Sequence, residues 1–129
     1  MHVLVDGSGE QLRLVHRLDR DTSGCLVLGR TRESAAALTR AFKDGLIKKS
    51  YLALVSPCPR GPSRGTIDAP LYKRRGVAGE ADRIMAVSEA EGGLPAVTHY
   101  RVIASSGSSA ASYALMELVP VSGRTHQVD

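Results

Sequence analysis

Eight residues that are polar or turn-forming stand within nine consecutive positions, from His16 to Gly24. They separate two apolar runs, and a cluster of this kind is where a rigid scaffold presents reactive groups. Two of the eight, Asp19 and Asp21, are carboxylates, and an ionised carboxylate can act as a nucleophile or as a base. The same residue types also build ordinary polar turns, which is the simpler interpretation of this segment alone.

The apolar runs on both sides of the cluster predict two short strands. Residues 12–16 alternate apolar and polar side chains, which is the period of a half-buried strand. Residues 25–29 are nearly continuous in apolar character, so we expect a strand buried on both faces, with Cys25 as a small buried residue. The polar cluster would then connect two strand ends.

A helix is expected next, over about residues 32–44. Thr31 is a suitable N-cap, and Glu33 places negative charge in the first turn, where the helix dipole favours it. Gly45 is positioned to end the helix in a left-handed cap. One apolar stripe at helical spacing is formed by Ala35, Leu38 and Phe42.

The rest of the chain predicts strands joined by loops. Residues 47–55 form one strand candidate, in which Ile47, Tyr51 and Val55 share a face by parity. A Pro/Gly-rich loop with two solvated arginines follows at 56–65, and a loop that is basic at its start covers 73–80. Many strands and one clear helix favour the α+β class, on a mostly antiparallel mixed sheet. Three further strand candidates are 83–87, 96–104 and 112–119, the last two joined by a flexible Gly/Ser hairpin loop.

The charge balance favours a polyanionic partner. Lys and Arg number 17 against 13 Asp and Glu, which gives a formal charge of +4 and a pI near 9.4. A basic surface concentrates phosphate backbones and releases their counterions on contact, although charge alone leaves an ordinary solvated surface equally open. The basic residues that could contact phosphates are Arg30, Arg32, Lys43, Lys48, Lys49, Lys73, Arg74 and Arg75.

The sequence carries no pattern typical of a metal site, a disulfide framework or a membrane segment. Cys25 and Cys58 lack metal-ligand spacing, and the four His residues form no metal pattern. Reduced cysteines suit a reducing compartment, so we expect a cytoplasmic protein. No apolar run is long enough to span a bilayer, and the first residues lack the charged and apolar parts of a signal peptide.

Four segments are informative together. They are H-R-L-D-R-D-T-S-G at 16–24, K-K-S-Y-L-A-L-V at 48–55, P-A-V-T-H-Y-R-V at 95–102 and V-P-V-S-G-R-T-H-Q-V at 119–128. In order and in spacing they resemble the motifs of the RluA family of pseudouridine synthases. Four ordered matches over most of the chain are far more specific than any single short pattern. The resemblance implies an isomerase that converts uridine to pseudouridine in RNA.

The implied reaction explains the residue types. Isomerising uridine breaks its N-glycosidic bond, turns the uracil and rejoins it to the sugar through C5. No redox or group-transfer step occurs, so no cofactor is expected. By resemblance Asp19 is the catalytic carboxylate, acting as a nucleophile at the sugar or the base, or removing a sugar proton. Asp21 falls outside the implied site, and we expect it to cap a turn.

The resemblance implies three further roles. Arg124 would hold Asp19 ionised and aimed, because a nearby guanidinium favours the charged form of a carboxylate; the alternative is a solvated turn residue. Tyr51 would stack on the target uracil and help to remove its C5 proton, a role compatible with a place in the core. Arg17 would fill the space left by a flipped-out nucleotide and stack on neighbouring bases.

The remaining expectations concern RNA contacts and the extent of the enzyme. His16, Arg20 and Thr22 join Arg17 as candidate RNA contacts, and His16 is also expected to pack or to form a hydrogen bond at the strand end. Residues 1–129 are expected to be a catalytic domain truncated at both ends, and a monomer.

The substrate would be large-subunit ribosomal RNA, with a tRNA-directed synthase as one alternative. A noncatalytic RNA-binding or regulatory fragment is another alternative. A glycoside hydrolase is disfavoured, because the second carboxylate that such enzymes use has no obvious candidate.

Overall fold

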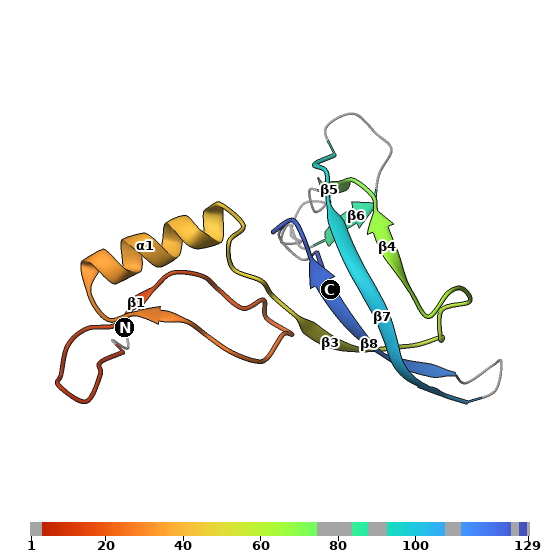
Figure 1. The fold of residues 1–129 in the computed structure, drawn as a ribbon, viewed down its shortest axis with the longest axis horizontal. Coiled ribbons are helices and arrows are strands. Elements are labelled where there is room, and N and C mark those ends of the chain that lie inside the picture. Colours follow the sequence, from red (N-terminus) through yellow and green to blue (C-terminus); the bar gives the residue numbers. More distant parts are fainter. Residues whose placement is uncertain (1–3, 75–83, 88–92, 108–111, 125–126, 129) are drawn as a thin grey trace. The chain divides into compact units, whose positions relative to one another are not determined.

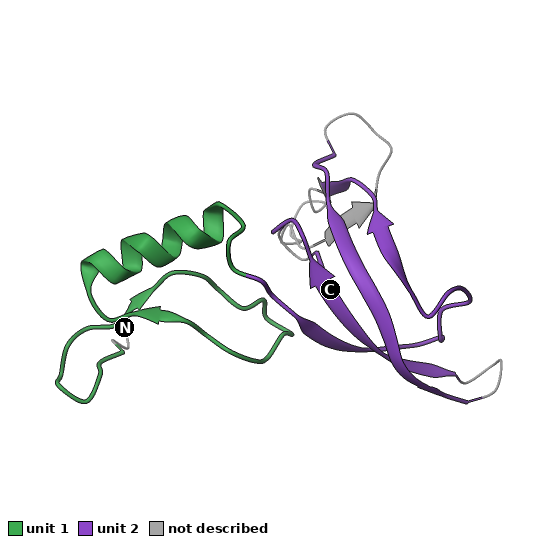
Figure 2. Ribbon diagram, viewed as in Figure 1, with its two compact units in different colours: residues 1–47, 129 green, residues 48–128 purple. Residues whose placement is uncertain are grey.

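The computed structural model describes residues 4–74, 84–87, 93–107, 112–124 and 127–128. Contacts divide the chain into two compact units, residues 1–47 with 129 and residues 48–128 (Figure 2). Unit 1 carries the helix of the described chain, and unit 2 carries its main antiparallel sheet (Figure 1). The predicted α+β class, with a mostly antiparallel sheet and one helix, is confirmed.

In unit 1, a short ladder and a helix frame the polar cluster. Strand β1 (Arg13–Leu14) pairs antiparallel with β2 (Leu28–Gly29). Helix α1 (Arg32–Lys43) follows β2 after two residues and packs on both strands. Residues 15–27, which connect the strands and carry the polar cluster, are called the site loop below (Figure 1).

Helix α1 begins and ends where the sequence predicts. The Ser34 N–H donates to the Thr31 hydroxyl oxygen at 3.1 Å, and the Thr31 N–H donates to the Ser34 hydroxyl oxygen at 2.9 Å, which forms a capping box. Hydrogen bonds from its own N–H and from the Thr31 side chain lower the pKa of Glu33. At the other end Gly45 adopts a φ of 69°, a left-handed conformation that glycine reaches without a Cβ clash.

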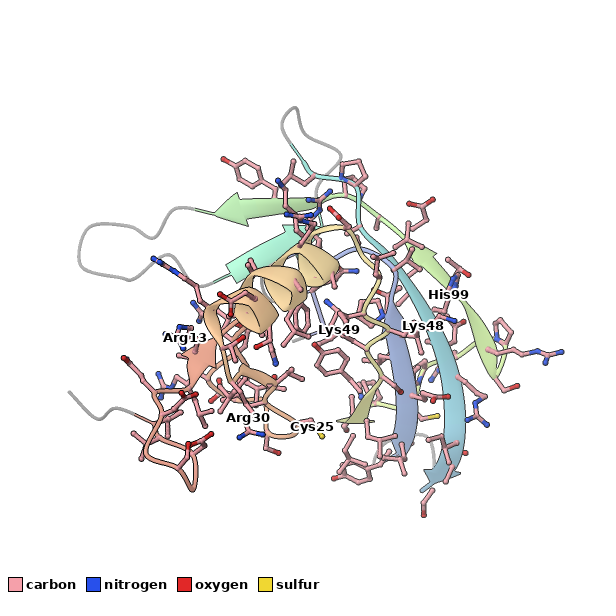
Figure 3. The ribbon with its side chains drawn as sticks, turned by 60° about the vertical axis from the view of Figure 1, so that its left-hand side comes forward. Arg13, Cys25, Arg30, Lys48, Lys49 and His99 are labelled. Carbon is pink, nitrogen blue, oxygen red and sulfur yellow. The ribbon has the colours of Figure 1, made fainter. Side chains whose placement is uncertain are left out.

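The strands beside the site loop differ from the prediction. The ladder holds only two residues from each of the expected strands 12–16 and 25–29. Cys25 is exposed, as are Leu26 and Val27, so the expected burial of Cys25 and of both strand faces is wrong (Figure 3). The physical reason is that α1 packs on the ladder, whereas these three residues precede it, in the site loop.

Unit 2 is built on a four-stranded antiparallel sheet in the order β3-β8-β7-β4. The β7–β8 hairpin forms its centre, and a separate two-stranded sheet pairs β5 with β6 (Figure 1). All four strand candidates of this region are confirmed with shifted bounds. The strands are β3 (Tyr51–Val55), β4 (Arg64–Asp68), β5 (Leu71–Arg74), β6 (Ile84–Val87), β7 (Val97–Ser106) and β8 (Tyr113–Pro120).

Strands β4 and β5 were not predicted. Strand β4 begins inside the expected loop 56–65, where Gly65 pairs with Tyr100 of β7. The Tyr100 hydroxyl oxygen lies 2.8 Å from the position of a Cβ on that glycine, so only glycine lets the ring cross the strand here. The expected loop 73–80 overlaps β5 at its start, and its residues 75–80 lie outside the described residues, as does part of the expected hairpin loop.

The two faces of the main sheet differ in burial. Ala114, Met116 and Thr98 share one face by register and are 0%, 5% and 7% exposed. Tyr51 and Val55 lie on this face and are half-buried, as the strand parity predicts. Ile47, which was expected to share the face, precedes β3. The opposite face exposes Leu52 and Leu54.

Replacing Gly29 by alanine is expected to destabilise unit 1. A Cβ on Gly29 would lie 2.5 Å from the Ala35 Cβ and 2.8 Å from the Ala35 backbone nitrogen, so β2 and α1 would have to separate. Overpacking of this kind costs roughly 1–3 kcal/mol. Urea unfolding followed by the helical circular-dichroism signal measures the change, with Gly7→Ala, which meets open space, as the control. Equal midpoints for the two variants would contradict the close packing.

Asp6 gives unit 1 a pH dependence below neutrality. Its carboxylate accepts hydrogen bonds from the hydroxyl and N–H of Ser8, from the Glu10 N–H and from Arg30, whose Nη2 lies 3.1 Å away. These bonds, with those from Ser8 the largest cause, lower the pKa of Asp6 from 3.8 to about 2.

The stabilisation from Asp6 is therefore fully present above the unfolded pKa and is lost as the pH falls toward the folded value. Thermal unfolding of the wild type and of Asp6→Asn at about pH 6 and about pH 2 tests this expectation. The wild type should be the more stable protein at the higher pH, and the difference should shrink at the lower one. A difference that does not change with pH would refute the role of the charge.

Candidate active site

His16 closes the base of the site loop. Its Nε2 accepts the Val27 N–H at 2.8 Å, so one ring joins the two ends of the loop. The same ring stacks on Phe42 of α1, with centroids 4.5 Å apart and planes at 29°. The expectation that His16 packs and forms a hydrogen bond at the strand end is confirmed. Because the ring contacts both the loop and the helix, it holds the intervening residues on a fixed base.

Asp19 lies in a turn near the middle of the site loop. The Thr22 N–H donates to the Asp19 carbonyl at 3.2 Å, which closes the turn. The Arg17 Nε lies 3.6 Å from Oδ1 of Asp19, so the structure brings these two predicted site residues together. The Asp19 side chain is 22% exposed, whereas that of Arg17 is 78% exposed. The carboxylate is thus held near the protein while the guanidinium faces solvent.

Asp21 differs from Asp19 in its surroundings. It lies in the same turn, but its side chain is 91% exposed and its ion pair with the exposed Arg20 spans 3.9 Å. An exposed pair at this distance contributes little to stability. Of the two carboxylates in the loop, Asp19 is the one that the protein holds in a defined environment.

Tyr51 and Arg124 belong to unit 2, at the end of the sheet where β3 begins and β8 ends. Tyr51 pairs with Leu118 of β8, and Arg124 follows β8 by four residues. The Arg124 Nε donates to the Pro95 carbonyl at 3.0 Å, and its backbone N–H donates to Oε1 of Gln127 at 2.9 Å. Arg124 is therefore anchored through its backbone and through its side chain, and it is not a freely solvated turn residue.

A lysine stands near the same turn. Lys49 precedes Tyr51 by two residues and is half-buried, and Lys48 and Lys49 lead into β3 (Figure 3). The Lys49 Nζ lies 3.4 Å from the position of a Cβ on Gly123. An ammonium beside the residue that precedes Arg124 adds positive charge to this end of the sheet, which suits a carboxylate or a phosphate.

Sequence reasoning did not single out four residues that contact the site elements. Thr98, Ser122 and Gln127 bond to one another around Arg124, and Lys49 was grouped only with the basic residues. A signal was available for all four, because each stands within a quoted motif. Lys49 lies in the motif at 48–55, Thr98 in that at 95–102, and Ser122 and Gln127 in that at 119–128. The pairing of Asp19 with Arg124 stays a prediction, because the two residues belong to separately described units.

Two further features bear on the kind of site. Within the described ranges, no group of three or more His, Cys, Asp or Glu side chains could hold a metal ion. Among those same residues, no helix has the length and apolar character that crossing a membrane requires.

Comparison with known proteins identifies the family. The family model for RNA pseudouridylate synthase matches residues 6–128. The chain belongs to the RNA pseudouridylate synthase family. It is 40% identical to "RNA pseudouridine synthase 4, mitochondrial" of Arabidopsis thaliana, with 92% of this chain and 28% of the relative covered. It is 32% identical to "Ribosomal large subunit pseudouridine synthase C" of Rickettsia bellii, with 96% and 38% covered.

Solved structures agree with this assignment. The structure of human RNA pseudouridylate synthase domain containing 1 superposes with a TM-score of 0.76 at 30% sequence identity. The match covers 91% of this chain and 48% of the human chain. The chain thus spans less than half the length of these pseudouridylate synthases.

Replacing His16 by alanine is expected to loosen the site loop. The variant removes the acceptor of the Val27 N–H and the stacking partner of Phe42. A net hydrogen-bond value of about 1 kcal/mol corresponds to roughly fivefold faster exchange of the Val27 amide hydrogen. Hydrogen exchange read by NMR measures it, with Cys25→Ala as a control in the exposed part of the loop. Unchanged exchange in His16→Ala would mean that the imidazole does not close the loop.

Proposed function

We propose that this chain supplies the catalytic carboxylate of an RNA pseudouridine synthase, which isomerises uridine to pseudouridine in structured RNA. The observation that carries the proposal is the anchored site loop, with Asp19 held in its turn, in a chain of this family. Asp19, Tyr51 and Arg124 are the proposed catalytic residues. Arg17, His16, Arg20 and Thr22 are the proposed RNA-contacting residues, with His16 acting through the position of the loop.

The reaction needs one base or nucleophile and one path for a proton. The bond from C1′ to N1 breaks, the uracil turns, a bond from C1′ to C5 forms, and the C5 proton leaves while N1 gains one. Asp19 attacks the sugar or the base as a nucleophile, or removes a sugar proton. Tyr51 stacks on the uracil and assists removal of the C5 proton. The isomerisation is balanced without a cofactor, because nothing is oxidised or transferred to a second molecule.

Arg124 holds Asp19 ionised in this proposal. Its Nε donates to the Pro95 carbonyl, which leaves the two Nη atoms of the guanidinium to donate end-on to a carboxylate. The anchoring of Arg124 from both its backbone and its side chain fixes the direction of that fork. Fixed charges that need no rearrangement during the reaction are the most effective electrostatic aid.

Arg17 has a different part, because the target nucleotide must leave the base stack before a carboxylate can reach it. Its side chain is 78% exposed, and its pair with Asp19 spans 3.6 Å, so leaving that pair costs little. A long, planar guanidinium can then stack in the space that the nucleotide vacates. Arg17 is thus a neighbour of Asp19 without RNA and a base-stacking residue with RNA.

Ribosomal RNA is the proposed substrate. The support is the similarity to relatives named "Ribosomal large subunit pseudouridine synthase C", together with the net charge of +4. A tRNA-directed enzyme is the alternative substrate class. A single catalytic domain, a monomer and a cytoplasmic location remain proposals, and two relatives are named as mitochondrial enzymes of Arabidopsis thaliana.

A noncatalytic RNA-binding or regulatory role is the second candidate function. The observations that favour it are the net charge of +4 and the 78% exposed Arg17 side chain, which can contact RNA without a reaction. This role predicts RNA binding that weakens steeply with salt and yields no product.

Replacing Asp19 by asparagine is expected to abolish pseudouridine formation and to leave RNA binding intact. The change removes the reactive charge and keeps the size of the side chain. Unmodified large-subunit ribosomal RNA transcript is incubated with each protein, and pseudouridine is detected by carbodiimide derivatisation and primer extension, with unmodified tRNA transcripts as the second substrate arm. Asp21→Asn, the same change two residues away at an exposed side chain, is the matched control.

The outcomes separate the candidate functions. Product from the wild type and from Asp21→Asn, but not from Asp19→Asn, supports the proposed enzyme. Turnover by Asp19→Asn would refute the role of this carboxylate. Salt-sensitive RNA binding without product from the wild type would favour the noncatalytic role.

A further inference from the structure

The side-chain amide of Gln127 uses its full hydrogen-bonding capacity. An amide has two N–H donors and a carbonyl oxygen with two lone pairs. The Gln127 Nε2 donates to the Val97 carbonyl and to the Thr98 hydroxyl oxygen, each at 3.0 Å. Its Oε1 accepts from the Ser122 hydroxyl and from the Arg124 N–H, each at 2.9 Å. All four bonds have near-ideal lengths, so this side chain has a single defined position.

The four bonds join two segments that are distant in the sequence. Val97 and Thr98 begin β7, whereas Ser122 and Arg124 lie in the turn after β8. Ser122 adds a second link, because its hydroxyl oxygen accepts the Val97 N–H at 3.0 Å. Thr98 is 7% exposed, so one end of the network is buried. A buried and fully satisfied polar network defines a single arrangement of the groups within it.

The network places Arg124 relative to β7 from two directions. The backbone of Arg124 is tied to β7 through Gln127, and its Nε is tied to the Pro95 carbonyl, two residues before β7. Without Gln127 the guanidinium would keep one anchor, and the peptide that carries it would lose the other. The backbone of Arg124 could then move relative to β7, and the direction of the guanidinium would change with it.

We propose that Gln127 is the positioning residue that fixes the direction of the Arg124 guanidinium at the end of the main sheet, an inference that rests on the proposed function. The chemistry requires an amide of this length. Glutamate offers no donor to the Val97 carbonyl, asparagine is shorter by one methylene, and methionine keeps the length and offers no hydrogen bond. Gln127 touches neither substrate nor reacting atoms in this role, and it acts only through Arg124.

Gln127→Met tests the proposal, and Gln11→Met is the matched control, because it makes the same change at an exposed glutamine in unit 1. In Gln127→Met, misaiming of a catalytic group is expected to lower kcat roughly 10- to 100-fold. KM is expected to change by less than about twofold, because Gln127 does not contact the substrate in this role. Both constants are measured on unmodified large-subunit ribosomal RNA transcript. Exchange of the Arg124 amide hydrogen, read by NMR without RNA, is expected to be faster in Gln127→Met than in Gln11→Met.

The outcomes are distinct. A folded Gln127→Met with lower kcat, unchanged KM and faster Arg124 exchange supports the proposal. Wild-type kcat in that variant, or a loss of activity that only follows the loss of folded protein, overturns it. If Gln127→Met does not fold, Ser122→Ala is used, which removes one bond to Oε1 and the acceptor of the Val97 N–H. A smaller loss of kcat in that variant supports the proposal, and wild-type kcat overturns it. Absence of product from the wild type is a failure of the proposed function, whereas equal kcat in active wild type and variant is a failure of this inference alone.

Discussion

The register of β7 on β8 decides which residues meet at the end of the main sheet. Thr98 lies opposite Pro120, so the chain leaves β8 beside the first residues of β7, and the turn that carries Arg124 begins there. The pairing of Tyr51 with Leu118 brings the start of β3 to the same end. A slip of one residue in the pairing of β3 or β7 with β8 would turn the Tyr51 or Thr98 side chain to the opposite face. It would also separate the polar groups that bond at this end of the sheet.

The sequence predicts best those elements whose signals are local. Helix α1 has a cap residue at each end and an apolar stripe between them, and it forms with nearly the predicted bounds. Strand β4 was missed because Gly65, which looks like a loop residue, is required there by the Tyr100 ring of the neighbouring strand. The burial of Cys25 was predicted wrongly for a related reason, since an apolar run does not say whether another element packs on it.

In the candidate site, too, local features could be predicted and contacts between distant segments could not. Residue types and motif order were enough to select Asp19, and its loop environment distinguishes it from Asp21 by side-chain exposures of 22% and 91%. The anchoring of Arg124 could not be predicted in this way. It depends on its own bond to the Pro95 carbonyl and on the bonds from Gln127 to Val97 and Thr98, which are 29 to 30 residues distant in the chain. Long-range hydrogen bonds between polar side chains leave no periodic pattern in a sequence.

The exposed position of Cys25 has a practical use. The chain has two cysteines; Cys25 is exposed in the site loop, six residues after Asp19, whereas Cys58 is half-buried and its N–H bonds to Ser112. A thiol-reactive fluorophore or spin label at Cys25 would therefore place a spectroscopic reporter in the loop that carries the proposed catalytic carboxylate, without a substitution in the chain. Such a reporter would follow the arrival of an RNA at the loop in real time, independently of any chemical product.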